Sequence, residues 1–277
     1  MKTTVGIVNW NSGRLLEECV ESVLRIPDVK IFVLDNHSTD GSTDFLVSPP
    51  ERVTYAACSD NKGFAGGVNT IIRGADTPYV LILNPDVRVT AGSIQLMEDV
   101  MESCPRSAAV GGYAGEKYLP RKLPTPWSLA IENLGSLSRP MIVGDSVVPV
   151  EQVAAAAMMI RREELKNRLL FDENFYPAWY EDVDFCRRLK RDNWEVYFAP
   201  NAKFPHSGGY SAKTMGSERF LRAYYRNQLR YARKWFRWHE VLLVKASVVL
   251  GMIGRMIARP WNFRGYVKVL FGALFAW

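Results

Sequence analysis

The sequence predicts an α/β protein in which a mixed, mostly parallel sheet is flanked by helices. Short apolar runs of strand length alternate with amphipathic stretches of helical length through the N-terminal part of the chain. A carboxylate closely follows two of the apolar runs: Asp35 after Val29–Leu34, and Asp86 after Tyr79–Leu83. Ligands bind at the carboxyl ends of the strands in open parallel sheets. The pattern therefore predicts both the fold class and the edge of the sheet that holds the site.

The elements follow one another at the spacing of β-α-β units. Continuous or alternating apolar residues predict strands, and apolar residues three and four apart predict helices. The predicted strands are Thr4–Val8, Val29–Leu34, Val53–Ala57, Tyr79–Leu83 and Trp194–Ala199, with further apolar runs at Ala108–Gly112 and Val153–Ile160. The predicted helices are Arg14–Arg25, one that ends at Gly74, Thr90–Ser103, one that begins at Glu181, and Ser217–Trp238. The proline-containing stretch 113–150 predicts a substrate-facing loop region.

The strand that begins at Tyr79 is expected to end in a ligand-binding turn, Asn84-Pro85-Asp86. Pro85 has no N–H and cannot continue a central ladder, so the strand ends there. Asp86 could then hold a divalent metal ion, and that ion could hold a diphosphate. The alternative is that these three residues form only a turn.

The stretch between the third predicted strand and the next helix is rich in glycine. It contains Asn61, Gly63, Gly66 and Asn69. Glycines just before a helix allow backbone N–H groups to approach a phosphate closely. A glycine-rich turn that serves only tight packing is the alternative.

A second dense stretch places three carboxylates, Glu181, Asp182 and Asp184, in four positions at the start of a helix. Aromatic residues precede them, including Trp179 and Tyr180. Aromatic rings limit solvent access and raise a carboxylate's pKa, which suits a general base. The alternative is that the acidic residues only complement the helix dipole.

His206 is the histidine best placed for chemistry, because it follows a predicted strand and precedes two glycines. His37 lies in a turn and His239 in the basic tail. An imidazole at a strand end could reach a metal ion, although a lone histidine is more often structural.

Composition indicates a reduced, cytosolic protein. The chain has 277 residues, 48% of them hydrophobic and 23% charged, which allows one large domain or a domain with an appendage. Its 4 cysteines form no C-x-x-C pair, so we expect no disulfide framework and no structural zinc. The first strand begins where a signal segment would lie. No apolar run reaches the roughly 18 uncharged residues of a spanning helix, so none is expected.

Charge divides the chain into a body, 1–215, and a C-terminal extension, 216–277. The extension holds 12 Lys and Arg against 2 Asp and Glu, a net charge of +10, whereas the body has a net charge of −4. In the predicted helix Ser217–Trp238, arginines recur every three or four residues and fall on one face. They are Arg219, Arg222, Arg226, Arg230, Arg233 and Arg237.

Apolar and aromatic residues follow this arginine row. The run Val241–Gly254 is short and interrupted by Lys245, and six aromatic residues mix with cations from Arg259 onward. This mixture predicts a helical extension that contacts an anionic membrane surface. The alternatives are an appendage packed on the body and a homodimer contact. Nucleic acid is not expected as a partner, because the body is acidic.

Taken together, the motifs resemble the family 2 glycosyltransferases of GT-A fold, and most closely their bacterial rhamnosyltransferase branch. The resemblance covers roughly residues 3–213 and rests on five motifs in order. They are Asp35-Asn36-x-Ser38-x-Asp40-Gly41-Ser42, Asn61-x-Gly63-Phe64-Ala65-Gly66-Gly67-x-Asn69, Leu83-Asn84-Pro85-Asp86, Glu181-Asp182-x-Asp184 and His206-x-Gly208-Gly209. Two positions depart from the family pattern. Asn84 stands where an acid is usual, and Leu169-Leu170 where the branch often has two glycines.

The resemblance implies a role for each motif. Asp35 would bind the pyrimidine base of a nucleotide sugar, and Asp86 would bind Mg²⁺ or Mn²⁺ at the diphosphate, with His206 completing the metal site. Asp182 would be the catalytic base, with Glu181 shaping the acceptor pocket. The other residues expected at the nucleotide sugar are Asn9, Trp10, Asn36, Asn61, Gly63, Gly66, Asn69 and Asn84.

The expected function is inverting, metal-dependent transfer of a sugar to a hydroxyl of a lipid-linked or cell-surface glycan. The donor expected first is dTDP-rhamnose, with a UDP-sugar next. We expect the enzyme in the cytoplasm, peripherally attached to the inner face of the plasma membrane. One alternative is a sugar-1-phosphate nucleotidyltransferase, but its N-terminal basic loop is missing, since Gly6–Arg14 offers only Arg14. The other is an inactive, membrane-associated protein that binds nucleotide sugars.

Overall fold

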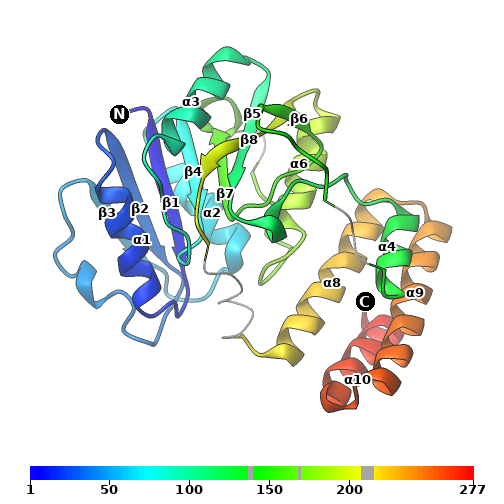
Figure 1. Cartoon of the computed structure of the whole chain (residues 1–277). Helices are drawn as coiled ribbons and strands as arrows, with labels where there is room; N and C mark the ends of the chain where they lie inside the picture. Colours follow the sequence, from blue (N-terminus) through cyan, green and yellow to red (C-terminus); the bar gives the residue numbers. More distant parts are fainter. Residues whose placement is uncertain (137–139, 168–169, 207–214) are drawn as a thin grey trace.

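The computed structural model describes residues 1–136, 140–167, 170–206 and 215–277, and shows a mixed eight-stranded sheet between layers of helices (Figure 1). The strand order is β3-β2-β1-β4-β7-β5-β8-β6. The strands are β1 Thr3–Asn9, β2 Val29–Asp35, β3 Val53–Ala57, β4 Tyr79–Leu83, β5 Ser107–Tyr113, β6 Val148–Val150, β7 Ala157–Arg161 and β8 Glu195–Lys203. Pairing is parallel from β3 through β4 and between β5 and β8, while β7 and β6 run antiparallel to their neighbours. The predicted mixed, mostly parallel sheet is confirmed.

Helices cover both faces of the sheet. The helices of the body are α1 Arg14–Leu24, α2 Gly63–Gly74, α3 Ser93–Ser103, α4 Pro126–Asn133, α5 Arg162–Leu165 and α6 Glu181–Arg191. Successive residues of β4 point to opposite faces, so Leu81 packs with α1 and α3 while Ile82 packs with α2 and α6. All five residues of β4 are buried, as expected for a strand covered on both sides.

The strand register brings the predicted site residues to one edge. Asn9 pairs with Asp35 at the ends of β1 and β2, and Ile7 pairs with Leu83 at the end of β4. The loops after these three strands therefore open side by side at the carboxyl edge of the parallel strands.

The stretch 113–150 contains more structure than the loop region predicted for it. Helix α4 and the short strand β6 form within it, together with a 3₁₀ turn at Glu116–Tyr118. A capping box between Thr125 and Ser128, followed by Pro126 at the first helical position, starts α4. The helix is short and only weakly amphipathic, which hides it from an analysis of periodicity.

The extension consists of α8 Ser217–Trp235, α9 Trp238–Ala258 and α10 Phe263–Phe271, followed by a last turn at Gly272–Ala276. Besides the two hydrophobic cores on the faces of the sheet, a third core joins these helices to the body (Figure 1). It holds Leu129 of α4 and Phe175 together with Tyr225 of α8 and Val248 of α9. The boundary at 215/216 stays a prediction based on charge.

The expectation that no helix is long and apolar enough to span a membrane is wrong for α9. This helix has 21 residues and a mean hydropathy of 1.9 over its most apolar 18-residue window. Lys245 interrupts the run in the sequence but does not interrupt the helix. Core helices of proteins that do not span a membrane can meet the same criterion, and 28% of this window is buried inside the protein.

Candidate active site

The turn after β4 carries Asp86 to the edge of the sheet. The Val87 N–H donates to the carbonyl oxygen of Asn84 at 3.1 Å and closes the turn. Val87 also forms an antiparallel bridge with His206. As a result, Nε2 of His206 lies 3.2 Å from Oδ1 of Asp86. The structure therefore brings together the two predicted metal ligands, which are 120 positions apart in the sequence.

The surroundings of His206 fit a metal ligand. Its side chain is 1% exposed, and no hydrogen bond reaches either ring nitrogen from the described residues. A buried imidazole without a hydrogen bond beside a carboxylate can share a divalent cation with it. In the described part of the chain, no group of three or more His, Cys, Asp and Glu side chains could hold a metal ion. The remaining ligands would be phosphate and water oxygens, as is common for Mg²⁺.

Asn9 and Asp35 form a buried network at the ends of β1 and β2. The Nδ2 of Asn9 donates to Oδ1 of Asp35 at 2.9 Å, and the Ser38 N–H donates to Oδ2 of Asp35 at 3.1 Å. Asn36 ties the next loop to this network, because its side chain accepts from the Lys62 N–H and donates to the Gly63 carbonyl. These polar residues fix the loops around a cavity.

A cavity of about 460 Å³ opens in front of these loops, and we call it the smaller cavity. Four predicted nucleotide-sugar residues line it, and Pro85 adds the turn that carries Asp86. The four are Trp10, Asn36, Asn61 and Gly63. Gly63 has a φ of +73°, and a Cβ there would lie 2.9 Å from the Pro177 carbonyl oxygen, so glycine is required.

Other predicted residues lie away from this lining. The Asn69 side chain donates to the Phe171 carbonyl and accepts from the Phe171 N–H, both at 2.9 Å. A Cβ at Gly66 would lie 2.9 Å from Cβ of Lys62. At these two positions the structure shows tight packing, which was the alternative interpretation of the glycine-rich stretch. Gly208, Gly209 and Leu169 lie outside the described residues.

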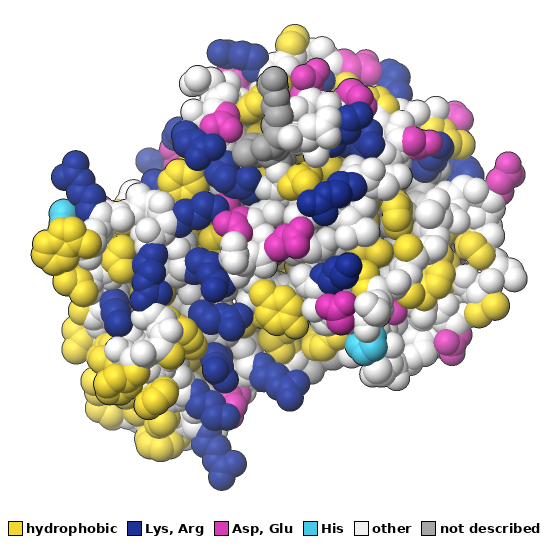
Figure 2. All heavy atoms as spheres, turned by 180° about the vertical axis from the view of Figure 1, so that it is seen from behind, with side chains coloured by type: hydrophobic (Ala, Val, Ile, Leu, Met, Phe, Trp, Pro, Cys, Tyr) yellow, Lys and Arg dark blue, Asp and Glu magenta, His cyan; other side chains and the backbone are white. Residues whose placement is uncertain are grey.

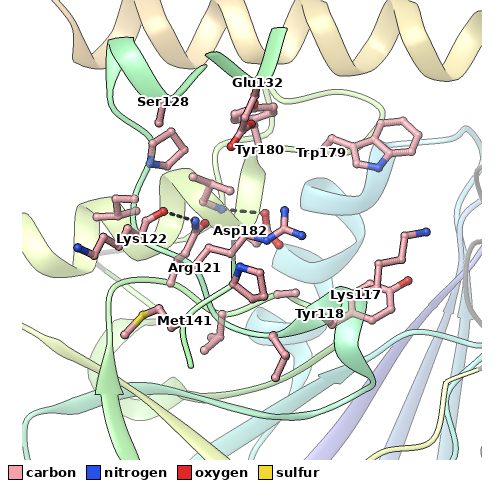
Figure 3. A pocket seen from close by; sticks show the side chains of 18 of the residues that line it. Lys117, Tyr118, Arg121, Lys122, Ser128, Glu132, Met141, Trp179, Tyr180 and Asp182 are labelled. Carbon is pink, nitrogen blue, oxygen red and sulfur yellow. Dashed lines mark hydrogen bonds between the residues drawn. The ribbon is translucent and has the colours of Figure 1, made fainter. Parts of the chain in front are cut away.

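A larger cavity of about 890 Å³ lies beside the first, and Figure 3 shows Asp182 on its wall together with Trp179 and Tyr180. Much of its opposite wall comes from the stretch 113–150. The lining there includes Lys117, Arg121, Lys122, Ser128, Glu132 and Met141. Trp179 lines both cavities, so one indole lies between them.

Glu181 and Asp182 differ in their surroundings. Burial raises the pKa of Asp182, but the N–H groups of Val183 and Ala155 donate to its carboxylate at 2.8 and 3.3 Å and favour the charged form. Burial, and then the charge of Asp182, raises the pKa of Glu181 well above its ordinary value. Oε2 of Glu181 has no hydrogen-bond partner among the described residues. Asp182 is therefore the carboxylate that ionises more easily.

Asp184, the third carboxylate of the motif, is structural. Its side chain is fully buried and accepts from Arg188, Lys234 and Trp235 at 2.8 to 2.9 Å. The last two residues belong to α8, so Asp184 fastens the extension to α6.

The arginine row of α8 does not form a single surface-facing stripe. Arg219, Arg222 and Arg226 line the smaller cavity, and Arg230 donates to the backbone carbonyl of Asn174. Spacing along a helix identifies a common face, but not what that face contacts. The sequence analysis therefore did not include Arg219, Arg222 and Arg226 among the residues of the site. The same helix reaches the larger cavity through Tyr224.

Fold and site together define a glycosyltransferase of GT-A fold, and comparison with known proteins identifies the family. The profile described as "Glycosyl transferase family 2" matches residues 4–163. The chain belongs to this family, as the motifs predicted.

Curated relatives and solved structures agree with this assignment. An N-acetylglucosaminyl-diphospho-decaprenol L-rhamnosyltransferase of Mycobacterium tuberculosis is 25% identical over 239 residues, covering 74% of this chain and 75% of the relative. The low-salt glycan biosynthesis hexosyltransferase Agl10 of Haloferax volcanii is 27% identical over 198 residues, covering 69% of this chain and 62% of the relative. The mannosyltransferase PcManGT of Pyrobaculum calidifontis, solved with GDP-Man and Mn²⁺, superposes with a TM-score of 0.60 at 14% identity, covering 99% and 87%. GalNAc-T7, solved with UDP, GalNAc and Mn²⁺, superposes with a TM-score of 0.69 at 13% identity. The superposition covers 87% of this chain and 49% of that structure.

Proposed function

We propose that the protein is an inverting, metal-dependent glycosyltransferase that moves L-rhamnose from dTDP-rhamnose to a hydroxyl of a lipid-linked glycan. The observation that carries the proposal is the pair of adjoining cavities. The smaller is lined by four of the predicted nucleotide residues and by Pro85 of the turn that carries Asp86, and the larger is lined by Asp182. Trp179 lies between them, so a donor in one and an acceptor in the other would meet beside a general base.

Residues in the smaller cavity and on the turn beside it would bind the donor. Asp86 and His206 would hold a divalent cation, which offsets the charge of a departing nucleoside diphosphate. Two structural neighbours were solved with Mn²⁺ and a nucleotide or nucleotide sugar, which supports this assignment. Trp10 and Asn61 would position the base and ribose of the nucleotide.

Asp182 would take the proton of the acceptor hydroxyl as that oxygen attacks the anomeric carbon. A buried carboxylate with a raised pKa is a stronger base than an exposed one, which suits this step. One base opposite the leaving group suffices for a single in-line displacement, which inverts the anomeric configuration. Glu181, with its higher pKa, would stay protonated and donate a hydrogen bond within the acceptor pocket.

The choice of sugar and acceptor rests on the mycobacterial relative, whose name specifies L-rhamnose transfer to a decaprenol-linked diphosphate sugar. The family assignment argues against a nucleotidyltransferase. The joint presence of Asp86, Asp182 and His206 argues against an inactive binding protein.

We also propose that the enzyme acts at the membrane surface, through an apolar face formed by α4, α9, α10 and the turns that follow each of them. Large hydrophobic side chains on this face are exposed to solvent. The exposed fractions of Ile257 and Trp261 are 80% and 81%. The other members include Trp127, Leu134, Leu250, Phe271 and Phe275. Figure 2 shows hydrophobic side chains gathered over the C-terminal helices beside a column of Lys and Arg. An anionic bilayer fits this combination of apolar and cationic groups.

The apolar face adjoins the larger cavity, because α4 contributes to both. Ser128 and Glu132 line the cavity, while Trp127 is 68% exposed on the same helix. A bilayer at this face would place the cavity at the level of lipid headgroups, where the diphosphate of a lipid-linked acceptor lies. The inner side of α9 packs in the third core, so we propose that the helix lies on the membrane.

The direct test is to assay dTDP-, UDP- and GDP-sugars with a prenyl-diphosphate-linked sugar acceptor in Mg²⁺ or Mn²⁺. We expect transfer from dTDP-rhamnose, loss of transfer in EDTA, and recovery on adding either metal. Asp86→Ala should abolish transfer, and His206→Ala should raise the metal concentration required. Full activity in EDTA would refute the metal role, and transfer from another donor only would refute the rhamnose assignment.

A further inference from the structure

Three arginines of α8 converge on the smaller cavity from outside the nucleotide-binding loops. Arg219, Arg222 and Arg226 are three and four residues apart, so they share one face of the helix. The same cavity is lined by Asn61 of the glycine-rich loop and by Pro85 of the Asp86 turn. The extension therefore supplies one wall of the cavity, and the sheet edge supplies another.

The positive charge of this wall has no counter-charge in the described part of the protein. None of the three arginines takes part in a salt bridge within residues 1–136, 140–167, 170–206 and 215–277. Burial, and then the charges of Arg230 and Arg222, lowers the pKa of Arg226. Its Nε is buried and has no hydrogen-bond partner among the described residues, although one Nη donates to the Tyr176 carbonyl.

We propose that Arg219, Arg222 and Arg226 form a binding subsite for the diphosphate of the nucleotide-sugar donor. Guanidinium groups bind phosphate oxygens through paired, charge-assisted hydrogen bonds. The subsite rests on the proposed function, because it presumes a nucleoside diphosphate in this cavity. It goes beyond that proposal, because it assigns the extension a part in binding the donor.

The observations favour the donor's diphosphate over that of a lipid-linked acceptor. The three arginines share their cavity with Trp10, Asn61 and Gly63, which are expected at the nucleotide. The larger cavity has its own cations, Lys117, Arg121 and Lys122, for an anionic acceptor. Each cavity therefore has its own basic residues, and those of α8 belong to the nucleotide side.

The subsite also offers a physical explanation for why position 84 is an asparagine and not an acid. The resemblance to the family would place an acid at position 84, and with Asn84 there the proposed metal site has fewer negative charges. Fixed guanidinium groups in the same cavity would share the neutralisation of the leaving diphosphate. The guanidinium groups would still offset the charge of the diphosphate while the metal ion exchanges.

The experiment measures binding of dTDP, dTMP and a short prenyl diphosphate to the full chain by calorimetry, with and without Mg²⁺. The variants are Arg222→Gln and the pair Arg222→Gln/Arg226→Gln, and the control is Arg233→Gln. Arg233 lies on the same helix, is exposed and lines neither cavity. Each charge-assisted pair that is lost should weaken dTDP binding about tenfold, whereas dTMP binding should change much less.

Arg222 is exposed, so its single variant tests the idea even if the double variant fails to fold. The proposal is overturned if dTDP binding is unchanged in Arg222→Gln, or if Arg233→Gln weakens it equally. Weaker binding of prenyl diphosphate alone would assign the arginines to the acceptor and also overturn it. In these cases the wild type still binds dTDP, and the proposed function stands. A wild type that binds no nucleoside diphosphate would refute both proposals.

Discussion

Neighbouring carboxylates in one motif suit different tasks because their hydrogen-bond partners differ. Asp182 has two backbone N–H donors that favour its charge, and Asp184 has a lysine, an arginine and an indole N–H. Glu181 has an oxygen without a partner among the described residues. The three carboxylates lie within four positions of the sequence, so their spacing alone does not distinguish the proposed base, Asp182, from the ion-paired Asp184.

Asp182→Asn should lower kcat at least ~100-fold, because the amide cannot accept the acceptor's proton. Donor binding should change little, since Asp182 lines the larger cavity and not the smaller. Steady-state kinetics with a donor titration separates the two effects. Glu181→Gln serves as the comparison, and its kcat should fall less than that of Asp182→Asn. A wild-type kcat in the Asn variant would move the role of base to Glu181.

The raised pKa of Glu181 also has a consequence for stability. The folded state holds this proton more tightly than the unfolded chain, so stability is lost as pH rises through the raised pKa. Glu181→Gln should therefore unfold at a higher urea concentration than wild type at about pH 8. The difference should vanish near pH ~4, where the unfolded chain binds the proton too. A difference that does not depend on pH would show that packing, and not charge, is responsible.

At the scale of elements, Asp184 decides how firmly α8 is held to α6. Asp184→Ala leaves Lys234 and Arg188 without their buried partner, and losing one member of such a pair costs about 3–5 kcal/mol. Urea unfolding measures this loss. Asp192→Ala is the control, because its pair with Arg191 is exposed to solvent and contributes little to stability. Equal losses in the two variants would contradict the anchoring role.

Most strands and the longer body helices were predictable because each carries a strong local signal, whereas α4, α5 and β6 were not predicted. A short, buried apolar run such as Tyr79–Leu83 has the length of a strand, and Pro78 and Pro85 mark its ends. The predicted family and GT-A fold are confirmed, and the chain order of the motifs was enough for both. Predicted ranges for these elements differ from the observed ones by only a few residues.

What could not be predicted depends on contacts between distant elements. The arginine row has a clear period, but only tertiary packing shows that Arg222 and Arg226 line a cavity. Asn69 carries a family motif, yet its partner is the backbone of Phe171, 102 positions away. Helix α9 looked short because one lysine divides its apolar run, although a single charge does not end a helix.

At the scale of the whole molecule, we expect the apolar face to bring the enzyme to anionic vesicles. Each basic residue near such a surface contributes about 1 kcal/mol, and Arg259 and Arg264 are exposed beside the apolar side chains. The double variant Ile257→Ser/Trp261→Ser should sediment with vesicles much less than the wild type. The measurement is co-sedimentation at several salt concentrations and anionic lipid contents.

Val47→Ser is the matched control, because Val47 is 86% exposed but lies near η1 (Asp44–Leu46), outside the apolar face. Wild-type binding in the double variant would place the membrane contact elsewhere. If the wild type ignores vesicles but forms dimers that the variant does not, the face pairs two copies of the chain. Extraction by salt and mild detergent is expected, since the inner side of α9 is packed within the protein.

Helix α8 contributes to both cavities, and it lies well beyond residue 163, where the match to the family profile ends. Asp182 and His206 lie beyond that point as well. The matched segment therefore holds most of the sheet and one wall of the smaller cavity. The proposed base, one of the two proposed metal ligands and the proposed arginine subsite lie in the part of the chain that the profile does not match. Family membership is therefore assigned on residues other than the proposed base and arginine subsite, so the profile match does not by itself identify the sugar that this chain transfers.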